Sequence, residues 1–244
     1  MSEIKNLLDL IPATIRPAGR NWMLYNDDCR DVLASLPDAS VDAVVTDPPY
    51  SERTHAGHDA LDGTESMRKL GYGFWTEADA RHYCSEFARV ARGWVVVMTD
   101  HMLAPTIADA LSKAGRYVFA PLPFFAPGSR VRLAGDGPSS WTIWIVVART
   151  TAQSRWGTLP GGYLAGEGWR ERTHMGGKPT KLMLEIVRDY SRDGDLILDP
   201  FAGSGTTGVA ALRMGRRFIG VERDPEFHRA ATRRLEAESE PKLF

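Results

Sequence analysis

The sequence predicts an open α/β fold in which a mostly parallel sheet carries helices on both faces. Short apolar runs alternate with segments of helical periodicity along most of the chain, which is the pattern of repeated βαβ units. The run 41–46 is β-branched and apolar and ends at two prolines, as a strand buried on both faces does. A glycine-rich turn at 202–208 lies between another apolar run and a helix. Together these observations predict a single domain over residues 1–244.

Local signals place the elements along the chain. Asp27 and Asp28 provide an N-cap for the first helix, Gly115 closes the third helix, and Pro179 fits the first turn of the fourth. We expect the strands 117–125 and 141–148 to pair antiparallel. The full expectation is strands at 21–25, 41–46, 93–98, 117–125, 141–148, 196–201 and 217–222, and helices at 29–36, 76–91, 104–114, 181–190, 209–214 and 225–237.

Two segments lack sustained periodicity. Residues 51–73 are predicted to form a long loop after Tyr50, and loops of that length beside a site are commonly lids or binding loops. Residues 128–132 and 150–177, on either side of the expected strand 141–148, are rich in Gly, Pro, Arg and Trp, and the range 128–177 is predicted to be an insert within the domain. Trp141 and Trp144 alternate with apolar residues, which predicts that they lie in the core, whereas Trp156 is expected either to stack on a partner or to pack inside the protein.

Composition excludes several classes of protein. The chain is 43% hydrophobic and 25% charged, which is ordinary for a globular protein. Cys29 and Cys84 make no disulfide framework, so a reducing compartment, the cytoplasm, is expected. Residues 1–20 have no long apolar core and contain two prolines, so we expect neither a signal peptide nor a membrane span there.

Charge is unevenly distributed along the chain. The net charge is −1, so no global basic field indicates a nucleic-acid partner. The segment 116–181 nevertheless holds nine Arg and Lys against three acidic residues, a net charge of +6, which leaves −7 for the remainder. The insert is therefore the part of the chain that is suited to an anionic partner.

The motif Asp47-Pro48-Pro49-Tyr50 lies at the carboxyl end of the strand 41–46, where ligands bind in open α/β sheets. Asp47 can accept a hydrogen bond from an amino group, and the Pro48 carbonyl can accept a second. Tyr50 offers a flat face on which a base can stack. The motif therefore suits a planar exocyclic amine held for attack.

The glycine turn predicts an adenosine-containing ligand. Gly203, Gly205 and Gly208 match the pattern G-x-G-x-x-G after a strand and before a helix, and Glu222 ends the next strand. Glycines let the backbone approach the ligand, and a carboxylate can hold both ribose hydroxyls. A nicotinamide dehydrogenase is the first alternative, but such enzymes usually open with this unit, and they give no role to the motif at Asp47.

The motifs of the chain, taken together, resemble those of a known protein family. Asp28-Cys29, Asp47-Pro48-Pro49-Tyr50, His174 with Lys178-Pro179, and the run from Asp199 to Thr207 occur in the order found in S-adenosylmethionine-dependent DNA amino-methyltransferases of the beta arrangement. The resemblance covers roughly residues 21–235. It implies a Rossmann-like methyltransferase fold with circularly permuted motifs, in which the glycine-turn strand lies beside the strand that ends at Asp47.

The resemblance also implies roles for individual residues. Asp47, Pro48, Pro49 and Tyr50 would form the catalytic motif, Glu222 would hold the ribose, Asp28 would reach the adenine amino group, and Lys178 would pair with the methionine carboxylate. The residues implied to bind S-adenosyl-L-methionine are Asp28, Asp47, Lys178, Asp199, Phe201, Ala202, Gly203, Ser204, Gly205, Thr206, Thr207 and Glu222. No metal site is expected, because the histidines lack a recognised ligand spacing.

Double-stranded DNA is the implied partner, with the target base flipped out of the duplex. The candidates for DNA contacts are Arg130, Arg132, Arg155, Arg170 and Arg172. The insert is short for the family, which favours a short target site or a homodimer. Asp at position 47 favours N6 of adenine over N4 of cytosine, on the resemblance alone. A protein glutamine methyltransferase and a non-catalytic binding module are the remaining alternatives.

Overall fold

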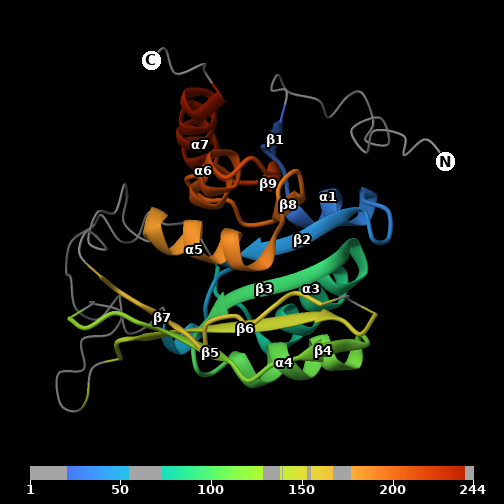
Figure 1. Cartoon of the computed structure of the whole chain (residues 1–244), viewed down its shortest axis with the longest axis vertical. Helices are drawn as coiled ribbons and strands as arrows, with labels where there is room; N and C mark the ends of the chain where they lie inside the picture. The colour runs from blue at the N-terminus through green and yellow to red at the C-terminus, as the bar shows by residue number, and fades with distance from the viewer. Residues whose placement is uncertain are drawn as a thin grey trace.

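The computed structural model describes residues 21–54, 73–128, 138, 140–152, 155–166 and 177–239. Within these residues, nine strands form one sheet in the order β1-β9-β8-β2-β3-β6-β5-β7, and β4 pairs with β6 (Figure 1). The strands are β1 Trp22–Tyr25, β2 Val41–Thr46, β3 Ala91–Thr99, β4 Arg116–Val118, β5 Leu122–Phe125, β6 Thr142–Thr150, β7 Tyr163–Leu164, β8 Leu196–Asp199 and β9 Arg217–Val221.

The directions of the strands create one functional edge. Strands β1, β9, β8, β2 and β3 run parallel, so their carboxyl ends emerge together at what we call the carboxyl edge. Strand β6 is antiparallel to β3 and therefore begins at this edge, whereas β5 and β7 end there. Strands β2 and β8 are neighbours, with Ala43 opposite Ile197, although they are far apart in sequence. The strand that leads to Asp47 (β2) and the strand that leads to the glycine turn (β8) thus lie side by side despite the permuted order of the motifs.

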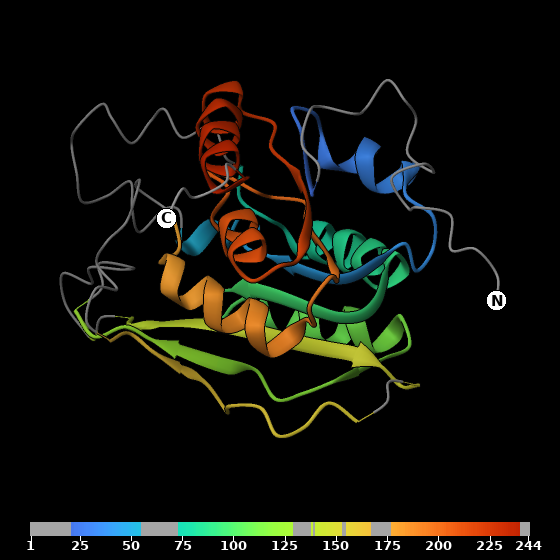
Figure 2. The same cartoon turned by 45° about the horizontal axis from the view of Figure 1, so that its top comes forward.

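Helices cover both faces of the sheet (Figure 2). The helices α1 Cys29–Ser35, α3 Glu77–Val90 and α4 Ala104–Lys113 lie on one face, and α5 Thr180–Tyr190, α6 Thr206–Arg213 and α7 Pro225–Ser239 lie on the other. Phe87 and Ile107 are fully buried on the first face, and Ile186 and Ala210 are fully buried on the second. The predicted Rossmann-like α/β fold is confirmed.

Helix starts follow the expected capping chemistry. The side chain of Asp28 accepts a hydrogen bond from the Arg30 N–H at 2.9 Å and caps α1. Thr76 and Asp79 form a capping box at the start of α3, a device worth about 0.5–2 kcal/mol. Both cysteines are free and buried. None of the described helices is long and apolar enough to cross a membrane.

Three local predictions were wrong. The expected strand 117–125 is two strands, β4 and β5, because Pro121 lacks the N–H that a continuous ladder needs. Helix α6 begins at Thr206 rather than at 209, since Gly205 takes a left-handed conformation (φ 80°) and serves as the N-cap. Trp141 is 41% exposed at the carboxyl edge instead of lying in the core, because it precedes β6 rather than belonging to it.

Candidate active site

A carboxylate follows each of the five parallel strands at the carboxyl edge. These residues are Asp28 after β1, Glu222 after β9, Asp199 at the end of β8, Asp47 after β2 and Asp100 after β3. Ligands of open α/β sheets bind at this edge. The site is therefore acidic, and it suits ligands that carry positive charge or hydrogen-bond donors.

Asp47 contacts two further candidate site residues, Tyr50 and Lys178. The Tyr50 hydroxyl donates a hydrogen bond to Asp47 Oδ1 at 3.0 Å, and the Lys178 ammonium forms a short ion pair with Asp47 Oδ2. The Lys178 Nζ atom also lies 5.0 Å from the centroid of the Tyr50 ring. Burial and the neighbouring Asp47 carboxylate hold the pKa of Tyr50 well above its usual range, so Tyr50 stays a neutral donor.

Asp100 anchors the chain that follows Tyr50. Its Oδ2 atom accepts hydrogen bonds from the Ser51 N–H at 3.0 Å, from the Ser51 hydroxyl and from the Thr54 hydroxyl at 2.6 Å. Its Oδ1 atom accepts from the N–H groups of Met102 and Leu103, both at 3.0 Å. Burial alone would raise the pKa of Asp100, but these hydrogen bonds outweigh it and lower the pKa. Asp100 thus fixes the turn that presents Tyr50.

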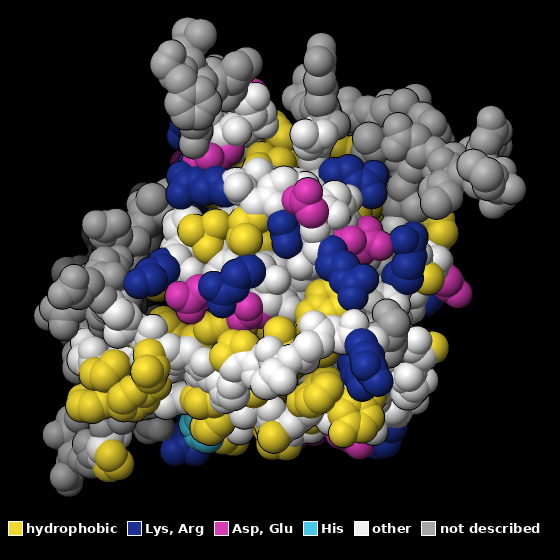
Figure 3. All heavy atoms as spheres, in the orientation of Figure 1, with side chains coloured by type: hydrophobic (Ala, Val, Ile, Leu, Met, Phe, Trp, Pro, Cys, Tyr) yellow, Lys and Arg dark blue, Asp and Glu magenta, His cyan; other side chains and the backbone are white. Residues whose placement is uncertain are grey.

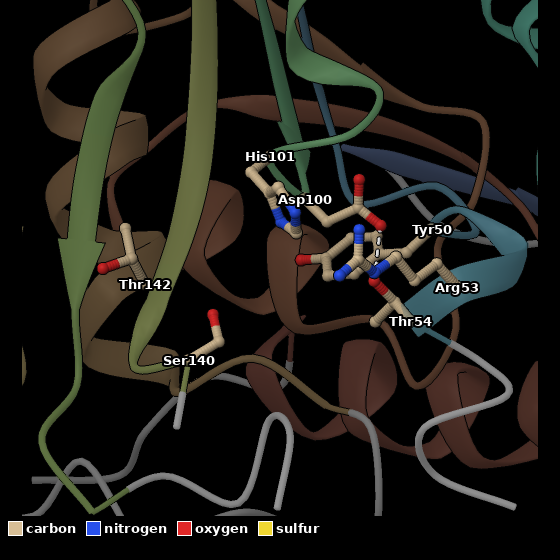
Figure 4. A pocket seen from close by; sticks show the side chains of 7 residues that line it. All are labelled: Tyr50, Arg53, Thr54, Asp100, His101, Ser140 and Thr142. Carbon is tan, nitrogen blue, oxygen red and sulfur yellow. Dashed lines mark hydrogen bonds between the residues drawn. The ribbon is translucent and has the colours of Figure 1, made fainter. Parts of the chain in front are cut away.

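A small hollow of about 20 Å³, enough for roughly one water molecule, lies beside Tyr50. Figure 4 shows its lining side chains, with Tyr50, Arg53 and Thr54 on one side, Thr142 and Ser140 on the other, and Asp100 and His101 above. Ser140 and Thr142 come from the start of β6, which reaches the carboxyl edge because β6 is antiparallel to β3. The lining residues carry hydroxyl, imidazole, guanidinium and carboxylate groups, although most of the exposed lining surface is apolar.

Asp199 is 2% exposed and holds the glycine turn from inside the protein. It accepts hydrogen bonds from the Thr46 hydroxyl at 2.7 Å, the Thr207 hydroxyl at 2.6 Å and the Phe201 N–H at 3.1 Å. Burial raises the pKa of Asp199 to about 6 despite these donors. Through Thr46, which precedes Asp47, Asp199 joins the glycine turn to the other motif.

The glycine turn has an open side and a packed side. Gly203 has a positive φ of 51°, its N–H donates to Glu222 Oε2 at 2.9 Å, and a Cβ placed on it would meet nothing within 4 Å. A Cβ on Gly205 would lie 3.0 Å from Ala231 of α7. The second oxygen of Glu222 accepts from the Asp224 N–H at 2.7 Å, and burial raises its pKa. Open space therefore adjoins Gly203 beside a carboxylate.

Arg234 of α7 clamps the same turn. Its Nη1 atom donates to the Ser204 carbonyl at 2.6 Å and to the hydroxyls of Ser204 and Thr206 at 3.1 and 3.2 Å. The Thr206 and Thr207 hydroxyls, which we expected to contact a cofactor anion, therefore have partners within the protein. Only Phe201 and Gly203 of the turn's residues 201–207 are more than slightly exposed.

Phe201, at the start of the glycine turn, belongs to an aromatic cluster. Its ring makes edge contacts with Trp75 and Tyr83, each at a centroid distance of 5.4 Å. Trp75 and Tyr83 stack on each other at 5.0 Å. Both are buried, whereas Phe201 is half-buried. The cluster fixes one apolar ring next to the open side of Gly203, and an adenine ring is a suitable ligand for such a surface.

Of the five arginines predicted to face DNA, Arg155 is within the described part of the chain. Arg155 lies beyond the end of β6, at the edge opposite the site, where its carbonyl accepts a hydrogen bond from Arg192 at 3.3 Å. The neighbouring Trp156 donates to the Asp189 carbonyl at 2.6 Å and packs against Trp94, so it belongs to the interior. Arg155 reaches the wrong edge because β6 runs antiparallel. Arg130, Arg132, Arg170, Arg172 and His174 lie outside the described residues.

Sequence reasoning missed Asp100, Arg234 and Trp75. Asp100 had a usable signal, since it follows a buried strand just as Asp47 does. Arg234 and Trp75 had none, because their contacts with the glycine turn and with Phe201 join distant parts of the chain. Asp28 caps α1, which leaves its expected contact with adenine untested.

The fold and site define a Rossmann-like α/β protein whose glycine turn and Asp47 motif lie on adjacent strands at the carboxyl edge. Comparison with known proteins agrees. Residues 137–233 match the family model N6_N4_Mtase, described as DNA methylase. YubD of Escherichia coli K12, provisionally named a methylase, is 30% identical over 223 residues, which cover 86% of this chain and 88% of YubD. The chain belongs to this family of S-adenosylmethionine-dependent DNA methyltransferases.

Two further curated relatives are type II methyltransferases. M2.MboI of Moraxella bovis is 26% identical over 243 residues, which cover 88% of each chain. M2.DpnII of Streptococcus pneumoniae is 52% identical over 67 residues, but these cover only 28% of this chain and 25% of that protein. The strong similarity to M2.DpnII is therefore local.

Two solved structures show the same fold. TTHA0409 of Thermus thermophilus, a provisionally named DNA modification methylase complexed with S-adenosylmethionine, is 25% identical, with a TM-score of 0.65 over 90% of this chain and 95% of its own. The cytosine-N4-specific PvuII DNA methyltransferase is 19% identical, with a TM-score of 0.66 over 89% and 87%. At that identity the PvuII likeness concerns the fold alone.

Proposed function

We propose that this enzyme transfers the methyl group of S-adenosylmethionine to the exocyclic N6 of an adenine flipped out of double-stranded DNA. The observation that carries the proposal is the pairing of Asp47 and Tyr50 at the carboxyl edge, on the strand next to the glycine-turn strand. A hydrogen-bond acceptor and an aromatic ring thus lie next to the adenosine-type site.

The cofactor-binding surface is built by Gly203, Phe201, Glu222 and Asp28. The open side of Gly203 lets a ligand approach the backbone, and Glu222 retains acceptor capacity for ribose hydroxyls, because a carboxylate has about four lone-pair sites. S-adenosylmethionine supplies an electrophilic methyl group on a sulfonium. In this proposal Asp199, Thr207 and Arg234 act indirectly, by holding the shape of the turn.

Asp47 and Tyr50 act on the target nucleotide. Asp47 and the Pro48 carbonyl accept hydrogen bonds from the amine, which orients the nitrogen and favours its attack on the methyl group. The nitrogen gains the methyl group and loses one proton, which Asp47 is placed to receive. The extruded base stacks on Tyr50, a contact worth about 1–3 kcal/mol.

The choice of adenine over cytosine rests on family resemblance. Asp occupies the first motif position here, and beta-arrangement enzymes with Asp at that position mostly modify adenine. A carboxylate suits either amine, so the hydrogen bonds alone do not discriminate between them. The fold does not discriminate either, since the cytosine-N4-specific PvuII enzyme shares it.

Acceptor duplexes of restricted composition test the proposal. Methyl transfer from radiolabelled S-adenosylmethionine is measured on genomic DNA, on duplexes that contain only A·T pairs and on duplexes that contain only G·C pairs. After digestion of the genomic DNA, we expect the label in deoxyadenosine. Of the two duplexes of restricted composition, only the one that contains A·T pairs is expected to take up label. Label on the G·C duplex, or in cytidine, would contradict the choice of adenine.

The parts of the insert 128–177 that adjoin the carboxyl edge are proposed to face DNA, whereas β6 carries the chain to the opposite edge. Gly128 follows β5 and Gly166 follows β7, and both strands end at the carboxyl edge. Ser140 precedes β6, which begins at that edge, and Gly177 precedes α5. Exposed apolar side chains gather near this end of β5 and β7 (Figure 3), with Leu164 77% exposed. Trp141, which is 41% exposed, is placed at this edge for a contact with DNA, whereas Trp156 lies at the opposite edge.

Salt dependence of DNA binding tests this assignment. Replacing Arg130, Arg132, Arg170 or Arg172 with alanine should reduce the salt slope of binding by about one unit for each phosphate contact that is lost. Arg155→Ala is the matched control and should leave the slope unchanged, because Arg155 lies at the opposite edge. Slopes that are unchanged in all four variants would show that the insert faces something other than DNA.

A homodimer and a cytoplasmic location are also proposed. The short insert supports the dimer, because one subunit then covers few base pairs. Light scattering at micromolar concentration, with and without DNA, measures the oligomeric state directly, and a monomer under both conditions would contradict it.

A further inference from the structure

Lys178 occupies both groups that the proposed function assigns to the target base. Its ammonium pairs with Asp47 Oδ2, while the Tyr50 hydroxyl occupies Asp47 Oδ1. The same ammonium lies 5.0 Å from the centroid of the Tyr50 ring, on the surface where a base would stack. A positively charged N–H donor thus stands where the neutral amine of the base would donate.

A neutral amine is a weak competitor for this position. Hydrogen bonds between two charged groups are about twice as strong as neutral ones, and this pair is largely withdrawn from water, with side chains 12% and 22% exposed. Displacing Lys178 without a new partner would leave both charges unpaired in a partly buried site. A second anion is therefore needed to take the ammonium before the base can enter.

The cofactor brings such an anion to the same place. The proposed base site at Asp47 and the proposed cofactor site at the glycine turn are adjacent, because Thr46, which precedes Asp47, donates a hydrogen bond to Asp199. Lys178, which pairs with Asp47, lies beside both proposed sites. Pro179 is the N-cap of α5 and fixes the backbone next to Lys178, while the four-carbon side chain has rotatable bonds that can carry the ammonium to a new partner. The methionine end of S-adenosylmethionine carries a carboxylate.

We propose that Lys178 is a positioning residue that couples the two sites: it blocks Asp47 and Tyr50 in the free enzyme and moves to the cofactor carboxylate when the cofactor binds. Cofactor binding then opens the base site, and a flipped base strengthens cofactor binding by the same factor, as linkage requires. This proposal rests on the proposed function, because it assumes that a base binds at Asp47 and Tyr50.

Binding measurements without turnover and without DNA test the first half. S-adenosylhomocysteine keeps the carboxylate, and 5′-methylthioadenosine lacks it. Lys178→Met should reduce the preference for S-adenosylhomocysteine over 5′-methylthioadenosine at least about 5-fold in calorimetric titrations. Lys181→Met removes an exposed lysine from the first turn of the same helix and should leave the preference unchanged. An unchanged preference in Lys178→Met would overturn the proposal.

Fluorescence of 2-aminopurine, placed at the target adenine once modified-base sequencing has located it, tests the second half. In the wild type, S-adenosylhomocysteine should raise the extrusion signal and the affinity for the duplex at least about 5-fold, and 5′-methylthioadenosine should not. Lys178→Met should extrude the base without cofactor, whereas Lys178→Arg should keep the dependence. Cofactor-dependent extrusion in Lys178→Met would overturn the proposal.

The two levels of failure are distinguishable. A wild-type protein that binds neither adenosine compound would refute the proposed cofactor site, and the coupling with it. Binding of both compounds, with base extrusion that does not depend on the carboxylate, would refute the role of Lys178 alone. Thermal melting of each variant confirms that it is folded before either measurement.

Discussion

Asp47→Ala is expected to reduce methyl transfer by at least about 10³-fold, because it removes the acceptor that positions the target amine in line with the methyl group. Cofactor binding should stay within several-fold of the wild type. The structure gives a reason for this, since Asp47 contacts Tyr50 and Lys178, while Glu222 and Gly203 form the proposed cofactor surface. Single-turnover labelling and calorimetry measure the two quantities separately.

The control for Asp47→Ala addresses the lysine left without its partner. Lys178 is 12% exposed, and loss of the pair can lower stability as well as activity. In the double variant Asp47→Ala with Lys178→Met, the unpaired charge is gone, so stability should return toward that of the wild type while methyl transfer stays lost. Full methyl transfer in either variant would refute the assignment of Asp47.

Asp100→Ala is expected to destabilise the protein by about 2–4 kcal/mol, because it leaves donors of Ser51, Thr54, Met102 and Leu103 without their acceptor. Methyl transfer should fall as well, since the turn that presents Tyr50 is no longer held. Asp109→Ala is the matched control on the neighbouring helix. Its carboxylate is 41% exposed, and loss of its salt bridges should change stability by less than about 1 kcal/mol.

The contribution of Asp100 to stability should depend on pH in a definite direction. The pKa of Asp100 is lowered from 3.8, so its stabilising contribution is present above that value and is lost as pH falls through the lower pKa of the folded state. The unfolding free energies of wild type and Asp100→Ala should therefore converge below pH 3.8 and differ fully at neutral pH. A constant difference over this range would show that Asp100 does not act as a buried, hydrogen-bonded carboxylate.

Local signals and one fold rule predicted the core of the structure. Apolar runs ending in Asp47 and Asp199 were recognisable as buried strands, and the rule that ligands bind at the carboxyl ends of parallel strands predicted that both motifs share an edge. The N-cap at Asp28 follows from the same local chemistry. These features depend on residues close in sequence.

The missed features depend on contacts between distant residues. Lys178 and Asp47 are 131 residues apart, and no spacing rule indicates that the ammonium pairs with the carboxylate of Asp47. Arg155 was assigned to the DNA side because charge along the chain does not reveal that β6 reverses direction. Thr207 was assigned to the cofactor, but its hydroxyl donates to Asp199, since a buried carboxylate takes the nearest donors.

The most direct test of the account is the identity of the methylated nucleoside. DNA from cells that express the wild-type protein, and from cells that express Asp47→Ala, is digested to nucleosides and analysed by mass spectrometry. N6-methyldeoxyadenosine is expected above background with the wild type, and none above background with Asp47→Ala. N4-methyldeoxycytidine as the main product, or equal N6-methyldeoxyadenosine with the variant, would contradict this expectation.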